Sequence, residues 1–256
     1  MLFDSIIYGP IRSRRLGLSL GINLMPTDCK VCSFDCVYCE CGFLVYPPRK
    51  HRLPTREDVS AALQSALEHM QEEGEQPDVI TFSGNGEPTL HPEFKGIIMD
   101  TVALRNRFFP SAKVSVLSNS TQLERKEVVE ALKLCDNRIL KLDSAVDDTM
   151  RLIDQPVNPY LNVNRIIQML QVFQGDFTLQ TCFLRGTHHG QAIDNTTETE
   201  LTAWYKAVHQ LHPKQLMIYA IDRATPIPTL EKIDRTQMES IAAPLRQEGY
   251  DVIISA

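Results

Sequence analysis

Two patterns of apolar residues alternate along this chain. Segments with apolar residues on one helical face predict helices, and short apolar runs between them predict buried strands. The stretch "PTREDVSAALQSALEHM" (54–70) gathers its apolar residues on one helical face and opens with a capping box formed by Thr55 and Asp58. The apolar, β-branched run "DVITFSG" (78–84) is typical of a buried strand. Further helices are predicted over residues 94–109, 126–134, 162–173, 198–211 and 234–250, and further strands over 18–25, 113–120, 138–145, 177–184, 215–221 and 251–256.

This alternation of strands and helices predicts an α/β fold with parallel strands joined by right-handed crossovers. A doubly wound sheet and a full or partial barrel both fit the pattern. In either architecture the chemistry belongs at the carboxyl ends of the strands, where the strand-to-helix loops converge. The sequence has no repeat, low-complexity tract or linker, so we expect one domain over residues 1–256.

The composition of the chain bears on which binding partners and which cysteine chemistry to expect. The chain has 26 Lys and Arg against 32 Asp and Glu, a net charge of −6, which gives no global attraction to nucleic acid or to an anionic membrane. From the N-terminal residues we expect neither a signal peptide nor a membrane span. We therefore expect a cytoplasmic protein, and in a reducing compartment seven cysteines point to metal or redox chemistry rather than disulfides.

Five of the cysteines lie in "DCKVCSFDCVYCECG" (28–42). A zinc knot is one interpretation, although ribbon-type zinc sites separate their CxxC pairs by roughly 15–20 residues and only "SFD" intervenes here. A thioredoxin-like redox pair is another, and it leaves the other cysteines unexplained. The third is an iron–sulfur cluster held by Cys32, Cys36 and Cys39, which form C-x3-C-x2-C. Because a four-iron cluster ordinarily uses four cysteines, three would leave one iron open to a substrate or cofactor.

The segment "CSFDCVYC" resembles the cluster loop of the radical S-adenosylmethionine (SAM) superfamily, including Tyr38 before the last cysteine. The resemblance implies a [4Fe–4S] cluster ligated by Cys32, Cys36 and Cys39, with SAM chelated to the open iron through its amino and carboxylate groups. In that family the reduced cluster cleaves SAM to methionine and a 5′-deoxyadenosyl radical.

The stretch "TFSGNGEPTLHP" (81–92) resembles the superfamily's Gly-Gly-Glu motif, which receives the methionine end of SAM. The matching residues are Gly84, Asn85, Gly86 and Glu87, with Asn85 where a second consecutive glycine is usual. An Asn-Gly pair also favours a hairpin turn. Two prolines and a predicted helix follow, however, instead of an antiparallel strand.

Polar residues end two further strands. By the resemblance, Ser118 and Asn119 in "LSNS" contact the ribose or carboxylate of SAM, although a simple Asx or Ser turn also fits. In "LKLDSA", Lys141 and Asp143 lie on one side of the strand because side chains alternate with period two. They pair with each other, or, as the resemblance implies, they or Ser144 touch SAM.

Together with "PIRSRRLGLSLGIN" (10–23), these motifs resemble the branch related to the wyosine-synthesis enzymes that modify transfer RNA. The resemblance implies a partial (β/α)6 TIM-like barrel and an enzyme whose 5′-deoxyadenosyl radical abstracts hydrogen from an unidentified substrate. It also implies an electron donor such as flavodoxin or ferredoxin, and assigns no catalytic residue beyond the cluster. The alternatives are an activase of a glycyl-radical enzyme, an enzyme that modifies RNA, a peptide or a small metabolite, and a noncatalytic zinc or iron–sulfur module. The acidic composition gives little support to a nucleic-acid target.

Overall fold

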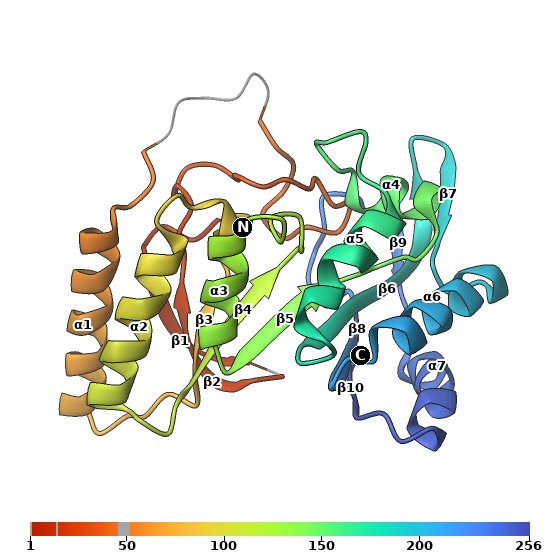
Figure 1. The fold of residues 1–256 in the computed structure, drawn as a ribbon. Coiled ribbons are helices and arrows are strands. Elements are labelled where there is room, and N and C mark those ends of the chain that lie inside the picture. The colour runs from red at the N-terminus through yellow and green to blue at the C-terminus, as the bar shows by residue number, and fades with distance from the viewer. Residues whose placement is uncertain (1, 14, 46–51) are drawn as a thin grey trace. The chain divides into compact units, whose positions relative to one another are not determined.

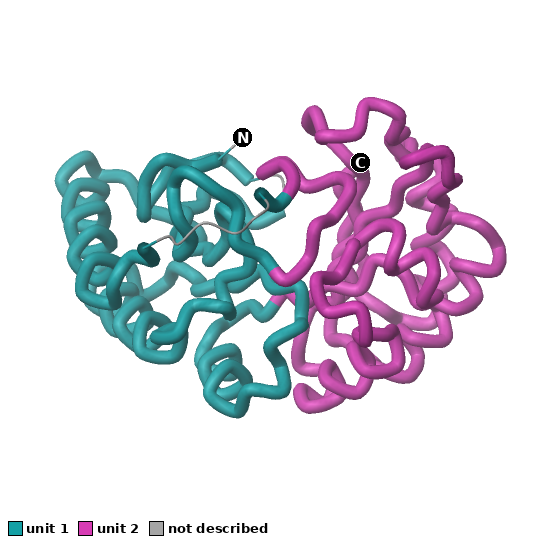
Figure 2. The backbone as a smooth tube through the Cα atoms, turned by 90° about the horizontal axis from the view of Figure 1, so that it is seen from above, with its two compact units in different colours: residues 1–32, 44–138 teal, residues 33–43, 139–256 magenta. Residues whose placement is uncertain are grey.

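A computed structural model describes residues 2–13, 15–45 and 52–256 (Figure 1). Arg14, in the N-terminal stretch that carries part of the family resemblance, lies outside the described residues. The chain divides into two compact units, residues 1–32 with 44–138 and residues 33–43 with 139–256 (Figure 2). The division falls within the cysteine loop, with Cys32 in unit 1 and Cys36 and Cys39 in unit 2.

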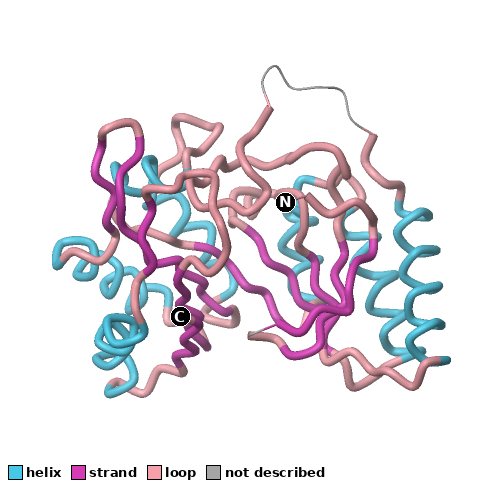
Figure 3. The backbone as a smooth tube through the Cα atoms, turned by 180° about the vertical axis from the view of Figure 1, so that it is seen from behind, coloured by secondary structure: helices cyan, strands magenta, loops and turns pink. Residues whose placement is uncertain are grey.

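Unit 1 is a sheet of strands with helices on one face (Figure 3). β2 pairs in parallel with β3, and β3 in parallel with β4, whereas β1 pairs antiparallel with β2 and was not predicted. The helices α1, α2 and α3 pack side by side (Figure 1). The elements are β1 (Ile7–Ser13), β2 (Gly17–Ile22), α1 (Arg56–Glu72), β3 (Val79–Phe82), the 3₁₀ turn η1 (Pro88–Leu90), α2 (Phe94–Phe108), β4 (Lys113–Ser118) and α3 (Lys126–Leu134).

Local sequence explains the best-defined of these elements. α1 begins at the predicted capping box, in which the Thr55 hydroxyl accepts from the Asp58 N–H (3.1 Å) and the Asp58 carboxylate accepts from the Thr55 N–H (2.9 Å). On its apolar face Leu63 and Leu67 are fully buried. All four residues of β3 are buried, as expected for a parallel strand inside a sheet.

Unit 2 contains a second set of parallel strands. β5 begins on the last two residues of unit 1, and the order within the set is β5, β6, β8, β10. The far half of β6 pairs antiparallel with two short strands, β7 and β9, that were not predicted. The elements are β5 (Asn137–Lys141), α4 (Asp147–Asp154), α5 (Val163–Leu170), the 3₁₀ turn η2 (Gln171–Phe173), β6 (Thr178–His188), β7 (Gln191–Asp194), α6 (Glu198–Leu211), β8 (Gln215–Ala220), β9 (Leu230–Lys232), α7 (Arg235–Gln247) and β10 (Val252–Ser255).

The structure thus confirms the predicted parallel pairing within each unit and every predicted helix. It adds α4 and the antiparallel strands. A single domain over residues 1–256 stays a prediction. Within the described part of the chain, no helix is both long enough and apolar enough to cross a membrane.

Candidate active site

The cysteine loop follows β2 and is irregular. Cys36 is buried, and Cys32 and Cys39 are half-buried. The Cys39 N–H donates to the Cys36 carbonyl (3.0 Å), which closes a turn between these two cysteines. All three candidate ligands therefore lie on backbone that is shaped by loop contacts rather than by a helix or strand.

In unit 1 the loop after β3 is bonded directly to the residue before Cys32. The Val31 N–H donates to the Asn85 carbonyl (3.0 Å) and the Glu87 N–H donates to the Val31 carbonyl (3.0 Å). Gly86 lies between them with φ +149°, and a Cβ at this position would overlap the Val31 carbonyl oxygen. The missing Cβ thus permits a close approach of the chain's own backbone, and the contact of Gly86 with SAM stays a prediction.

Asn85 has a fully buried side chain whose polar atoms are bonded within unit 1. Its Nδ2 donates to the carbonyls of Phe3 and Pro26, its Oδ1 accepts from the Phe3 N–H (each 2.8 Å), and its N–H donates to Asn23 Oδ1 (3.0 Å). Gly84 gives Asn23 room, since an added Cβ would lie 2.6 Å from Asn23 Oδ1. Sequence reasoning missed Asn23, whose only signal was a polar residue at the end of an apolar strand.

Glu87 organises the polar end of β4. Its buried carboxylate accepts from the Thr89 N–H (3.0 Å), the Ser118 hydroxyl (2.9 Å) and the Asn119 N–H (2.6 Å). Burial raises the pKa of Glu87, and these donors act in the opposite direction. Asn119 in turn directs its Nδ2 at Cys32 Sγ (3.5 Å). Unit 1 therefore brings Cys32 together with the predicted residues of both loops.

Unit 2 places Lys141 beside Cys36. The Lys141 ammonium lies 2.9 Å from Cys36 Sγ, 3.0 Å from Asp143 Oδ2 and 2.6 Å from Asp154 Oδ1. The predicted pairing of Lys141 with Asp143 is confirmed. Burial lowers the pKa of Lys141, but the two carboxylates outweigh it and raise that pKa well above its usual range. Burial raises the pKa of Asp154 to about 7; sequence reasoning missed this residue.

Asp143 is the centre of a second network in unit 2. The Tyr38 hydroxyl donates to its Oδ2, the Cys182 N–H donates to its Oδ1 (2.8 Å), and Asn195 Nδ2 donates to its carbonyl (2.7 Å). Burial, followed by the charge of Asp143, raises the pKa of Tyr38. The Tyr219 hydroxyl lies 3.4 Å from that of Tyr38. Sequence reasoning identified Tyr38 and Asp143 but neither Asn195 nor Tyr219.

Ser144 has a different environment. Its hydroxyl donates to Glu200 Oε2 (2.7 Å), and Glu200 is a buried residue of α6. The contact ties the end of β5 to α6. The roles of Ser144 and of the other predicted residues as SAM contacts stay predictions.

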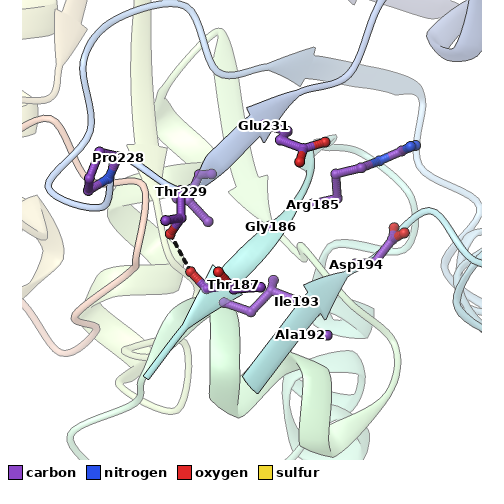
Figure 4. Close-up of a pocket in the computed structure, with 10 residues that line it drawn as sticks. Arg185, Gly186, Thr187, Ala192, Ile193, Asp194, Pro228, Thr229 and Glu231 are labelled. Carbon is purple, nitrogen blue, oxygen red and sulfur yellow. Dashed lines mark hydrogen bonds between the residues drawn. The ribbon is translucent and has the colours of Figure 1, made fainter. Parts of the chain in front are cut away.

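A hollow of about 570 Å³ lies on the β6, β7 and β9 strands of unit 2 (Figure 4). Arg185, Asp194 and Glu231 line it, and the Thr229 hydroxyl donates to the Thr187 carbonyl (2.6 Å) at one end. Among the residues the structure describes, its lining includes none of those predicted from the sequence.

The comparisons with known proteins decide the family. The model of the radical SAM superfamily matches residues 28–186, which include the cysteine loop and the polar residues after β3, β4 and β5. The chain belongs to the radical SAM superfamily. This membership implies a [4Fe–4S] cluster and SAM, and it indicates a radical SAM enzyme.

Curated relatives cover the chain to different extents. A UPF0026 protein of Synechocystis sp. is 30% identical over 86% of this chain and 77% of its own length. A UPF0026 protein of Helicobacter pylori is 28% identical over 85% of this chain and 67% of its own length. A protein named GTPase Obg from Brachyspira hyodysenteriae is 29% identical over 91% of the chain, which spans only 32% of that relative.

Solved structures confirm the predicted fold class. A radical SAM methyltransferase from Sphaerobacter thermophilus matches with a TM-score of 0.65 at 14% identity, covering 92% of this chain and 65% of that one. TYW1 with a bound lysine-pyruvate adduct matches with a TM-score of 0.65 at 14% identity, covering 91% and 74%. The chain therefore has the α/β fold of the radical SAM partial barrel, and its neighbours include the wyosine-synthesis enzyme that the sequence resembles.

The residues present fit the implied cluster. Cys32 and Cys36 each have a nitrogen donor, Asn119 Nδ2 and Lys141 Nζ, within hydrogen-bonding distance of the sulfur. Donors of this kind are the expected outer partners of metal-bound thiolates.

Proposed function

We propose that the protein cleaves SAM reductively at a [4Fe–4S] cluster held by Cys32, Cys36 and Cys39, and uses the 5′-deoxyadenosyl radical to abstract hydrogen from a substrate. One observation carries the proposal. In each unit, a polar side chain at the carboxyl end of a parallel strand, Asn119 or Lys141, donates to the sulfur of a cysteine in the matched triplet.

When bound, the cluster supplies the electron that breaks a carbon–sulfur bond of SAM. The chain's own part is to fix the ligands and to present polar groups around them. In unit 1, Glu87 holds Ser118 and the Asn119 backbone in place, and Asn119 reaches Cys32. Because the Asn85 and Glu87 side chains are bonded within the protein, we propose that the loop 84–87 meets SAM through its backbone.

In unit 2, Asp143 is the group we propose for a polar contact with SAM, together with Tyr38. Its carboxylate is held by the Cys182 N–H, the Tyr38 hydroxyl and the Lys141 ammonium, which together fix its position. Radical SAM enzymes generally need an electron donor, and a flavodoxin or ferredoxin would fill that role here. No substrate follows from the solved neighbours, because likeness at 14% identity shows the fold alone.

The experiment is anaerobic reconstitution with iron and sulfide of the wild-type protein, Cys36→Ala and Cys135→Ala. Cys135 is the matched control, since it is a buried cysteine at the end of α3, outside the loop. We expect about four irons per chain in the wild type and in Cys135→Ala, with an electron paramagnetic resonance (EPR) signal of the reduced cluster that changes when SAM is added.

Cys36→Ala should lose the SAM-dependent change of the EPR signal. If Cys36→Ala kept this change, the ligand assignment would be wrong. If the wild type bound zinc in place of iron and gave no cluster signal, the proposal would fail in favour of a noncatalytic metal module.

A further inference from the structure

The C-terminal end of α4 accepts hydrogen bonds from the cysteine loop on both sides of Cys36. The Asp35 N–H donates to the Asp154 carbonyl (2.9 Å), and the Val37 N–H donates to the Ile153 carbonyl (2.9 Å). The backbone of Cys36 is therefore held between two hydrogen bonds from one short helix end. The same residue, Asp154, also reaches the side chain of this cysteine, with its Oδ1 3.6 Å from the sulfur.

Lys141 contacts both Asp154 and Cys36. Its Nζ is 2.6 Å from Asp154 Oδ1 and 2.9 Å from Cys36 Sγ. The Asp154 carboxylate and a Cys36 thiolate, 3.6 Å apart, would repel each other without this ammonium to offset their charges. Asp143 adds a third contact to the ammonium at 3.0 Å, so the position of the charge is defined from three directions.

Aromatic rings and burial keep this ammonium away from water. Nζ lies 5.2 Å from the centroid of the Phe34 ring and 4.9 Å from that of the Tyr38 ring, and the Lys141 side chain is 11% exposed. Such ring faces attract a cation. With little water to screen it, a charge at this position acts strongly on its neighbours.

We propose that Lys141 is a positioning residue that raises the reduction potential of the cluster through a charge-assisted hydrogen bond to Cys36, and that Asp154 holds the ammonium and offsets part of its charge. The inference rests on the proposed function and deepens it. One-electron reduction adds a negative charge beside the Cys36 sulfur, and a fixed cation there stabilises the reduced form more than the oxidised form. Hydrogen bonds to the sulfurs and net charge are established determinants of cluster potential.

The proposal predicts shifts of opposite sign. Lys141→Met removes the donor and the cation, so the midpoint potential should become more negative. Asp154→Asn removes the opposing charge and keeps the side-chain shape, so the potential should become less negative. A purely structural role for this cluster of side chains would lower iron content in both variants without moving their potentials in opposite directions.

The test is a redox titration of the reconstituted proteins without SAM, followed by EPR and driven by photoreduced deazaflavin as a low-potential reductant. Lys141→Arg keeps the charge and should lie closer to the wild type than Lys141→Met does. Lys214→Met is the matched control: Lys214 precedes the amino end of β8, whereas Lys141 lies at the carboxyl end of β5, and Lys214 pairs with Asp176 at 3.0 Å. It should leave the potential unchanged.

Three results would overturn the inference. One is a Lys141→Met potential equal to that of the wild type, with only SAM affinity reduced, which would make Lys141 a SAM contact. Another is a shift of Lys141→Met and Asp154→Asn in the same direction. The third applies if Lys141→Met does not retain a cluster: an Asp154→Asn potential equal to that of the wild type would then refute the inference. Failure of the proposed function is separate, because then the wild type itself would hold no cluster or cleave no SAM.

Discussion

Gly86→Ala should destabilise unit 1 and disturb the residue next to Cys32. Gly86 adopts φ +149°, a conformation that other residues avoid, and a Cβ would overlap the Val31 carbonyl oxygen. Holding a residue other than glycine in such a conformation costs about 1–3 kcal/mol. Because the overlap is with backbone, Val31 itself has to move.

Moving Val31 weakens its two hydrogen bonds, from the Val31 N–H to the Asn85 carbonyl and from the Glu87 N–H to the Val31 carbonyl, both 3.0 Å. Each bond contributes about 0.5–1.5 kcal/mol. With the backbone strain, Gly86→Ala should lower the free energy of unfolding by about 2–6 kcal/mol, a large part of the 5–15 kcal/mol typical of a folded protein.

The assay is urea unfolding of the wild type and two alanine variants, followed by far-ultraviolet circular dichroism. Gly74→Ala is the matched control. Gly74 also has positive φ (+70°), but an added Cβ would meet nothing within 4 Å, so it carries the strain without the overlap. Gly86→Ala should lose about 1–3 kcal/mol more than Gly74→Ala. Equal losses in the two variants would refute the argument that the Val31 contact requires this glycine.

Other features of the structure give further predictions. Asn85→Asp would set a carboxylate against the carbonyl oxygens of Phe3 and Pro26, and should cost about 2–4 kcal/mol in urea unfolding; an unchanged midpoint would contradict this network. Burial raises the pKa of Cys135 to about 12, so iodoacetamide at pH 8 should label it, by mass spectrometry, far more slowly than in the unfolded chain. Burial lowers the pKa of His91, so its contribution to stability is complete above the unfolded pKa of about 6.5 and is lost as pH falls through the folded pKa. His91→Gln should therefore reduce the loss of stability between pH 7 and 5, and an unaltered pH dependence would show that His91 is not responsible.

The helices were predictable because their apolar period is strong and their ends are marked. α3 and α6 have the predicted bounds, and α1 begins at the predicted Thr55 cap. β1 was missed because "IYGPIRS" contains Gly9 and Pro10, which count against a strand, although an edge strand tolerates proline. α4 was missed because eight residues show little more than two turns of periodicity.

The candidate site was predictable where chemistry is unusual in the sequence. Spacing marked the cysteines, and charge in an apolar strand marked Lys141 and Asp143. Asp154 gave no signal, because it closes a short helix that periodicity did not reveal and meets Lys141 only after folding. Asn195 is similar: it follows the unpredicted β7, and its amide bridges the Asp143 and Cys182 carbonyls.

The central claim is that three cysteines support radical cleavage of SAM. The most direct measurement is the formation of 5′-deoxyadenosine by the anaerobically reconstituted protein with dithionite and SAM, resolved by liquid chromatography. We expect the product in the wild type and in Cys135→Ala, and none when Cys32, Cys36 or Cys39 is replaced by alanine. Product formation that survived all three replacements, or an intact cluster that gave none with SAM and reductant, would contradict the account.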